Sequence, residues 1–331
     1  MKRTILARSL IHATLLAALW FMQSHPVRAQ ELEKIRIGYS GTGISQYTLE
    51  IARRNGIFRK NGLDPEIVYV GSGSLLSQAL IAGSFDVAFS QGSESVLAKL
   101  HGADMRIVAA VANHFNHVFL ARPSITSLKQ LKGKRVAVSR FGSGSHFMTD
   151  LVVKEAGLDP KKDVTVLQIG NSSSRMAAIM ARSVDATIMA ADFVPLAKKE
   201  GFNILVDLAE TKVEYPFLTF HVMGPVIERN SKMVKAFIKS VSEGIRLLKN
   251  NRNAAKAAIQ AALKTNDAET LEYAAARSAK VLEVRPFPTV AGIQTVLEEL
   301  SEREPKAKTS KFEDFVDLRA LRELEREGVF K

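Results

Sequence analysis

The sequence predicts an α/β protein with two lobes, each a parallel or mixed sheet covered by helices. Short apolar runs alternate with amphipathic stretches along most of the chain, which is typical of strands joined by crossover helices. The length of 331 residues suits about two domains of roughly 150 residues each. With 46% hydrophobic and 24% charged residues, the composition is globular and excludes a disordered or collagen-like chain.

The predicted strands are short apolar runs bounded by Gly, Ser, Asn or Asp. They are Ile35–Tyr39, Ile67–Val70, Val87–Phe89, Ile107–Val111, Val118–Ala121, Arg135–Val138, Val164–Ile169, Ala186–Met189 and Ile204–Val206. Most of them precede a helical pattern. After Phe217–Val222 the pattern changes, and the last third is predicted to be mostly helical, over Ser231–Asn250, Arg252–Lys264, Ala268–Lys280 and Val290–Glu302.

The first residues have the pattern of a secretory signal peptide. Lys2, Arg3 and Arg8 precede an apolar run that ends at Met22, and Ala29 completes a small-residue cleavage motif. The apolar run is shorter than the roughly 20 residues that a membrane anchor needs. We therefore predict a signal peptide over residues 1–29, cleaved after Ala29, and a mature protein in the periplasm.

The common enzyme motifs are mostly absent from the sequence. There is no cysteine, which excludes disulfides, thiolate metal sites, iron–sulfur clusters and cysteine nucleophiles. The segments 41–46 and 142–147 lack the third glycine of a dinucleotide-binding loop, and no Walker lysine follows a glycine loop. The pair His114 and His117 lies between two predicted strands, where the side chains would face opposite ways. The net charge of +12 comes without an aromatic stacking platform. We expect no enzyme activity, cofactor, metal site or nucleic-acid partner.

One segment of the chain recurs. Gly71–Asp86 aligns without gaps with Gly170–Asp185 at an offset of 99 residues, and a predicted strand follows each. Upstream, residues 61–65 resemble residues 156–160. Two interpretations are open at this point, chance convergence of two βαβ units or two similar lobes in tandem.

Turns rich in serine and glycine follow the predicted strands. Ligands of open α/β sheets bind beyond the carboxyl ends of strands, where free helix N–H groups favour an anion. The turns are Ser40–Ser45, Gly71–Ser74, Ser90–Ser93, Arg140–Ser145 and Gly170–Ser173. Within these turns Arg140 carries the one fixed positive charge, and a guanidinium can bind a carboxylate or sulfonate with two hydrogen bonds. For any single turn the alternative to ligand binding is that its serine or glycine is an ordinary helix N-cap.

Several stretches carry a family resemblance over nearly the whole predicted mature chain. They are residues 35–39, 53–63, 71–74, 82–88, 127–138 and 184–187. With these the chain resembles the solute-binding proteins of ABC importers, in the nitrate/sulfonate/taurine and thiamine-pyrimidine-precursor family. The resemblance implies a type II periplasmic-binding fold, with lobe 1 from residues 30–120 and 221–331, lobe 2 from residues 121–220, and a two-strand hinge through Phe119–Pro123 and Phe217–Val222.

The resemblance also implies a mechanism and a set of contacts. A monomer would capture a small solute by lobe closure and deliver it to a membrane permease powered by an ATPase. The implied ligand-binding residues are Thr42, Gly43, Ser45, Ser72, Gly73, Ser74, Ser90, Gln91, Arg140, Phe141, Gly142, Ser143, Ser145, Ala191 and Asp192.

At this point alternatives are open for the solute and for the class of protein. A small organic anion, a sulfonate or a carboxylate, suits the hydroxyl and amide donors, and a pyrimidine or thiamine precursor is the alternative. The similar thiamine-pyrimidine synthases are enzymes, but their iron motif needs a cysteine that this chain lacks. Presentation of the closed form to a membrane receptor would be a role in sensing.

Overall fold

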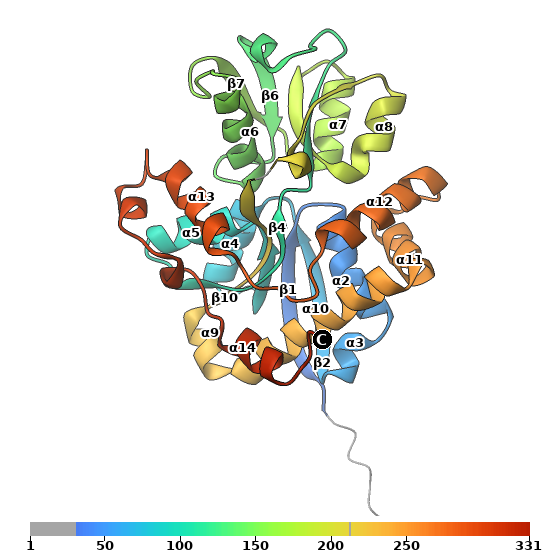
Figure 1. Cartoon of the computed structure of the whole chain (residues 1–331), viewed down its shortest axis with the longest axis vertical. Coiled ribbons are helices and arrows are strands. Elements are labelled where there is room, and N and C mark those ends of the chain that lie inside the picture. The colour runs from blue at the N-terminus through green and yellow to red at the C-terminus, as the bar shows by residue number, and fades with distance from the viewer. Residues whose placement is uncertain (1–30, 212) are drawn as a thin grey trace, which may run out of the picture. The chain divides into compact units, whose positions relative to one another are not determined.

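The computed structural model describes residues 31–211 and 213–331, and Glu33–Lys331 form one compact unit. The predicted signal peptide lies outside the described residues. The unit contains two five-stranded sheets flanked by helices (Figure 1). The second sheet comes from one continuous stretch of chain, whereas the first combines strands from before and after that stretch. Within the described residues, no helix combines the length and the apolar character needed to cross a membrane.

The first sheet has the strand order β2-β1-β3-β10-β4, and we call the part built on it lobe 1. β1 is parallel to β2 and β3, whereas β10 is antiparallel to both β3 and β4. The strands are β1 (Glu33–Ser40), β2 (Leu63–Val70), β3 (Val87–Ser90), β4 (Met105–His114) and β10 (Glu214–Met223). Its first helices are α2 (Ile44–Arg54), α3 (Ile57–Lys60), α4 (Gly73–Ile81) and α5 (Gly92–Leu100).

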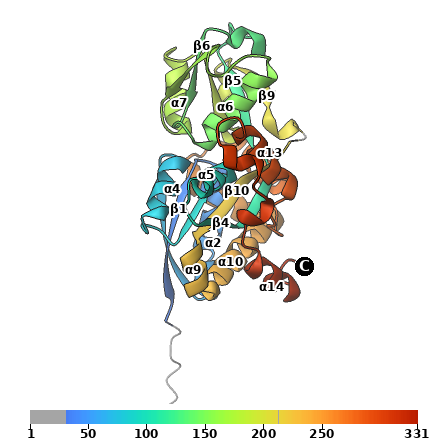
Figure 2. The ribbon, with the colours of Figure 1, turned by 90° about the vertical axis from the view of Figure 1, so that its left-hand side faces the viewer.

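The second sheet has the order β7-β6-β8-β5-β9, with the same sequence of parallel and antiparallel pairs, and we call the part built on it lobe 2 (Figure 2). Its strands are β5 (His117–Ala121), β6 (Lys134–Val138), β7 (Val164–Gln168), β8 (Ala186–Ala190) and β9 (Asn203–Asp207). Its helices are α6 (Gly144–Glu155), α7 (Ser172–Met180) and α8 (Val194–Lys199), with short 3-10 turns η1 (Leu128–Leu131), η2 (Ala191–Phe193) and η3 (Leu208–Glu210).

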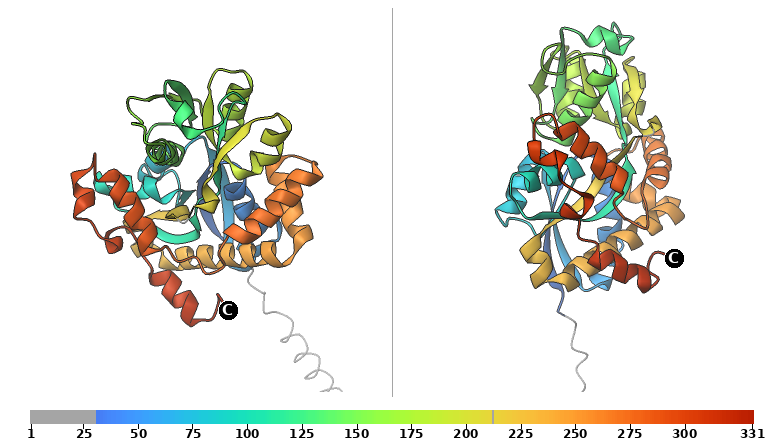
Figure 3. Two further views of the ribbon diagram at one scale, coloured as in Figure 1. Left: turned by 45° about the horizontal axis from the view of Figure 1, so that its top comes forward. Right: turned by 60° about the vertical axis from the view of Figure 1, so that its left-hand side comes forward.

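Helices of the last third pack on lobe 1, as the sequence predicts (Figure 3). They are α9 (Gly224–Arg229), α10 (Ser231–Asn250), α11 (Arg252–Leu263), α12 (Ala268–Val281), α13 (Val290–Leu300) and α14 (Arg319–Arg326), with the 3-10 turns η4 (Pro305–Lys308) and η5 (Phe312–Asp314). The long helix α10 begins after Asn230, whose side chain accepts a hydrogen bond from the Met233 N–H. Its buried residues recur every three or four positions, so one face packs against α2 and α3.

The chain crosses between the sheets twice, at positions slightly earlier than the predicted hinge. It leaves lobe 1 between His114 and His117 and returns between Asp207 and Glu214. Residues 119–121 therefore belong to β5 of lobe 2, and residues 217–222 to β10 of lobe 1. The reason is that both strands are mostly buried and pair from their first residues, His117 with Ala190 and Glu214 with His114.

An arginine on α12 ties the two crossing segments together. The Arg277 Nε donates to Asn116 Oδ1 at 2.7 Å in the first crossing. Its two Nη atoms donate to the two carboxylate oxygens of Asp207, at 3.0 and 2.7 Å, at the start of the second. Such a bidentate pair fixes both distance and orientation, so the crossings are held side by side.

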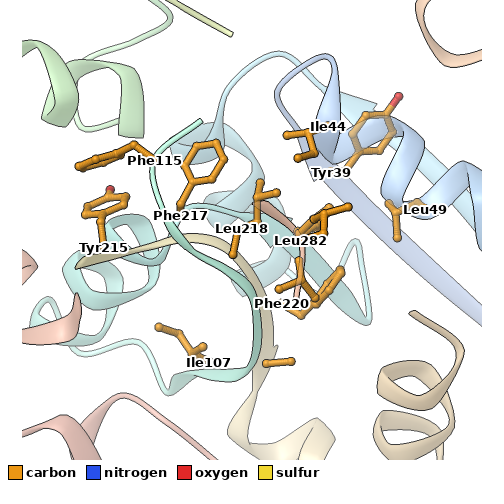
Figure 4. Packing of buried hydrophobic residues seen from close by; sticks show 14 of the residues in the cluster. Tyr39, Ile44, Leu49, Ile107, Phe115, Tyr215, Phe217, Leu218, Phe220 and Leu282 are labelled. Carbon is orange, nitrogen blue, oxygen red and sulfur yellow. The ribbon is translucent and has the colours of Figure 1, made fainter. Parts of the chain in front are cut away.

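Aromatic residues form the core next to the crossings (Figure 4). Phe115 stacks on Tyr215 with ring centroids 4.3 Å apart. Farther along β10, Phe220 stacks on Phe89 at 4.1 Å and meets the edge of Phe237. These contacts extend one continuous apolar core from the lobe 1 sheet to the crossing point.

The recurring segments adopt the same structure down to individual hydrogen bonds. In lobe 1, Asp86 Oδ2 accepts from the Arg36 N–H at 2.8 Å, and the Arg36 guanidinium donates to Gly83 O at 2.9 Å. In lobe 2, Asp185 Oδ2 accepts from the Arg135 N–H at 2.9 Å, and the Arg135 guanidinium donates to the carbonyl of residue 182 at 2.9 Å. Every partner is displaced by 99 positions, which favours two similar lobes over chance convergence.

Candidate ligand-binding site

A small cavity lies where the carboxyl ends of the strands of both sheets meet. The starts of α2, α4 and α5 line it from lobe 1, and the starts of α6 and α7 line it from lobe 2. Its volume is about 60 Å³, far below the roughly 300–1,000 Å³ of pockets for drug-sized ligands. Helix N-termini from both lobes thus converge on a space fit for a small solute.

Four of the five predicted turns supply predicted site residues to this cavity. The predicted residues that line it are Thr42, Ser45, Ser72, Gly73, Ser90, Gln91, Ser143 and Ser145. They come together because each follows a strand of a parallel pair, whose carboxyl ends lie at one edge of the sheet.

The predicted cation of the site lies elsewhere. Arg140 is exposed and does not line the cavity, and neither do Phe141, 52% exposed, and Gly142. The backbone of Gly142 is in the left-handed region at φ +72°, and the Phe141 N–H donates to Gln168 Oε1 at 2.8 Å. These features turn the loop outward before Ser143 caps α6, so the sequence-based assignment of Arg140 to the cavity is corrected.

The other predicted residues lie close by without lining this cavity. Gly43 and Ser74 belong to the same turns but do not contribute to its lining, and Ala191 and Asp192 are buried in η2. The Asp192 Oδ1 accepts from the Tyr47 hydroxyl at 3.0 Å. Burial raises the pKa of Asp192 to about 6, against the smaller lowering effects of that hydrogen bond and nearby N–H groups.

The positive charge that does line the cavity belongs to Arg175, which is 3% exposed. Its Nη1 donates to Gly170 O at 2.5 Å, its Nε to Ile188 O at 3.1 Å and its Nη2 to Ser172 Oγ at 3.2 Å. Burial lowers the pKa of Arg175 to about 10, so the guanidinium remains charged at neutral pH. No salt bridge to Arg175 forms in residues 31–211 and 213–331, where its partners are neutral oxygens. A buried cation without a counter-charge favours an anion in the cavity.

Sequence reasoning missed Arg175 although the repeat contained a signal. Arg175 is the one charged residue in the helix 172–180, at the position that Leu76 holds in the lobe 1 copy. A charged residue at a position where the other recurring unit has a buried leucine indicates a role other than core packing.

Three further polar atoms of the cavity lining are buried and lack a hydrogen-bond partner among the described residues. They are Thr42 Oγ1, Ser90 Oγ and His117 Nδ1. Burial, with Arg175 and Arg277 nearby, lowers the pKa of His117 to about 3. The imidazole is therefore neutral at pH 7 and offers one donor and one acceptor. Unsatisfied buried groups of this kind are costly unless a solute or water pairs with them.

A buried acid also lines the cavity. Glu94 on α5 is 5% exposed, and its Oε1 accepts from the Gly144 N–H of lobe 2 at 2.9 Å. Burial raises the pKa of Glu94, while the hydrogen bonds that it accepts lower it. In the described part of the chain, no cluster of three or more His, Asp or Glu side chains suits a metal ion.

Comparison with known proteins identifies the family. Residues 44–255 match the family described as NMT1/THI5 like. The chain belongs to this family. A Brucella abortus protein that carries the name of a binding protein is 28% identical over 248 residues, covering 73% of this chain and 72% of the relative. A Haemophilus influenzae protein named for thiamine biosynthesis is 26% identical over 217 residues, covering 62% of this chain and 65% of the relative.

Solved structures share the fold of this NMT1/THI5-like chain. A Bordetella bronchiseptica protein superimposes with a TM-score of 0.80 at 20% identity, over 90% of this chain and 98% of that one. The alkanesulfonate-binding protein of Xanthomonas axonopodis, bound to MOPS, gives 0.69 at 20% identity, over 85% and 96%. The nitrate-binding protein of Synechocystis gives 0.69 at 14% identity, over 92% of both chains. The predicted periplasmic-binding-protein fold is confirmed, and the family match agrees with the resemblance that the sequence carries.

Proposed function

We propose that this protein is the solute-binding component of an ABC importer and that it captures a small organic anion of the sulfonate or carboxylate class. The observation that carries the proposal is Arg175, a buried cation on the cavity with no acidic partner in the described residues. The N-termini of α6 and α7 add partial positive charge at the same place.

The mechanism follows from two lobes joined by two adjacent crossings. Opening at the crossings exposes Arg175 and the serine hydroxyls, and closure buries the solute between the lobes. Desolvation then strengthens the attraction between the guanidinium and the anion. The closed form docks on a permease whose partner ATPase drives import. The predicted signal peptide over residues 1–29 supports a periplasmic location for this step.

A second candidate is a pyrimidine or thiamine precursor. The rings of Tyr69, His117 and Phe217 line the same cavity and supply faces for stacking. Glu94 supplies an acceptor for an amino group. The name of the Haemophilus relative points the same way.

Thermal unfolding against a panel of solutes separates these candidates. The panel holds alkanesulfonates, nitrate, aliphatic and aromatic carboxylates, and pyrimidines. A ligand at one hundred times its dissociation constant adds about 2.7 kcal/mol of stability, which raises the melting temperature by several degrees. We expect a sulfonate or carboxylate to give this shift.

Two arginine variants decide which residue binds the anion. Arg175→Leu should abolish the shift, and Arg140→Ala, which removes an exposed arginine, should retain it. A shift by a pyrimidine alone that survives in Arg175→Leu and disappears in Glu94→Gln would replace the anion with the second candidate.

A further inference from the structure

Two buried carboxyl groups, one from each lobe, accept hydrogen bonds from the opposite lobe. Glu94 belongs to α5 of lobe 1 and Asp192 to η2 of lobe 2, and each is 5% exposed. Both follow the third strand of their recurring unit, β3 in lobe 1 and β8 in lobe 2. They therefore lie just after corresponding strands of the two lobes, one position apart in the alignment of the repeat.

Glu94 reaches the start of α6. Its Oε1 accepts from the N–H of Gly144, the first residue of α6, at 2.9 Å, and its Oε2 accepts from the Gln91 N–H of its own lobe at 2.9 Å. The carboxyl group also lies against Gly73, where an added Cβ would come within 1.8 Å of Oε1. The glycine leaves the space that this carboxyl group fills.

Asp192 reaches the start of α2 from the other side. Its Oδ1 accepts from the hydroxyl of Tyr47, in the first turn of α2, at 3.0 Å. Its Oδ2 is buried without a hydrogen-bond partner among the described residues and lies against Gly43, where an added Cβ would come within 1.9 Å. Gly43 is the N-cap of α2 and provides no capping side chain.

The two helices are themselves equivalent elements. α2 follows β1 and α6 follows β6, the first strand of each recurring unit. An acidic group near a helix N-terminus is favoured by the helix dipole and by the free N–H groups of the first turn. Each lobe thus supplies an acid to the N-terminus of the corresponding helix in the other lobe, and this happens only while the lobes are together.

We propose that Glu94 and Asp192 are positioning residues that form a reciprocal latch and hold the lobes closed over the cavity. When the lobes part, Gly144 N–H and the Tyr47 hydroxyl lose these partners. The proposal deepens the proposed function and rests on it for the opening and closing of the lobes. It requires no particular solute.

The absence of cysteine makes the latch directly measurable in the ligand-free protein. Gln78→Cys on α4 and Ala177→Cys on α7 place two spin labels at exposed, equivalent positions of the two lobes. Pulsed electron paramagnetic resonance then gives the distribution of distances between lobes. We expect a predominantly short distance for the otherwise unaltered protein. Glu94→Ala and Asp192→Ala should each lower the closed-to-open ratio at least about tenfold, since each loses hydrogen bonds of a charged group.

Matched variants separate the latch from a general loss of stability. Asp192→Asn keeps an oxygen for its hydrogen bond from Tyr47 and should open less than Asp192→Ala. Glu94→Gln has one oxygen for the two N–H groups that Glu94 binds, so its distribution should lie between those of the unaltered protein and Glu94→Ala. Asp86→Ala removes an acid within lobe 1, before β3 and away from the cavity, where Asp86 accepts from the Arg36 N–H at 2.8 Å, and should leave the distance unchanged. Tyr47→Phe removes the hydroxyl that donates to Asp192 and should shift the distribution slightly toward longer distances. This variant tests the Asp192 side of the latch if Asp192→Ala fails to fold.

Three results would overturn the latch. They are an unaltered protein that is already open, alanine variants that keep its short distance, and an Asp86→Ala variant that opens as far as Asp192→Ala. A panel of solutes without any thermal shift would count against the proposed function and would leave these distances unaffected, so the two failures are distinguishable.

Discussion

The recurring units of lobe 1 and lobe 2 share their strand order and the hydrogen bonds of Asp86 and Asp185, yet one of their buried positions carries a charge in lobe 2 alone. In α4 that position is Leu76, 0% exposed, and in α7 it is Arg175, 3% exposed. Lobe 2 accommodates the charge because Gly170 O, Ile188 O and Ser172 Oγ accept its hydrogen bonds. The same arrangement of strands and helices therefore packs an apolar side chain in lobe 1 and holds a charge on the cavity in lobe 2.

The largest effect is expected from copying the lobe 2 residue into lobe 1. Leu76→Arg should destabilise the protein by about 3–5 kcal/mol, the cost of an uncompensated buried charge. The site has no spare room, since a Cβ on Gly38 would already come within 2.4 Å of Leu76 Cδ1, and Gly73 replaces the hydroxyl of Ser172. Urea denaturation measures the loss, with Leu76→Met as the control. A loss as small as that of the control would show that both lobes tolerate the charge equally.

The next largest effects are expected at Asp86 and Asp185. We call them the anchoring aspartates because each accepts a hydrogen bond from the first strand of its recurring unit, and their substitution should destabilise the two lobes unequally. Asp185 accepts from Arg135 and lies 3.3 Å from Arg122, whereas Asp86 accepts from the Arg36 backbone. Asp185→Asn should therefore cost about 1.5 kcal/mol at pH 7, the low end for hydrogen bonds to charged groups because Arg135 is partly exposed. Asp86→Asn should cost less.

The loss of stability caused by Asp185→Asn should also depend on pH. Its hydrogen bond from Arg135 holds the pKa of Asp185 below the ordinary value of 3.8. A depressed pKa gives stability that is present above the unfolded-state pKa and is lost as the pH falls through the folded-state pKa. The gap between unaltered protein and Asp185→Asn should shrink below about pH 4. Denaturation curves from pH 7 to 3 test this, and a gap that widens in acid would contradict it.

The smallest effect concerns the turn before each anchoring aspartate. Gly83 and Arg182 hold equivalent places there, both in the left-handed region, at φ +75° and +59°. Gly83→Ala should cost about 1 kcal/mol and Arg182→Gly should gain a similar amount, because glycine adopts this conformation without Cβ strain. Thermal denaturation of both variants gives the comparison. Equal losses would mean that the Arg182 side chain contributes packing that Gly83 does not need.

Much of the fold was predictable because local signals agree with it. The strand predicted at 35–39 lies within β1, and the helix predicted at 290–302 begins with α13. Glycine and serine mark the strand ends, and the repeat fixes the equivalence of the lobes. The strand β10 was predicted only as a hinge, since no local pattern states which sheet a returning strand joins.

The site was predictable only in part. The serine turns line the cavity as expected because strand ends fix their place. Arg140 was preferred because it lies in a turn, but the left-handed Gly142 directs that turn outward. Arg175 and Glu94 lie inside helices, and their direction toward the cavity depends on how two lobes meet, which a one-dimensional pattern does not contain.

The most direct test is a crystal structure of the protein with the sulfonate or carboxylate that raises its melting temperature most. We expect the oxygens of the anion to lie within hydrogen-bond distance of the Arg175 guanidinium and the start of α7. An anion at Arg140 on the outside, or a ring between Tyr69 and Phe217 with no anionic group at Arg175, would contradict it.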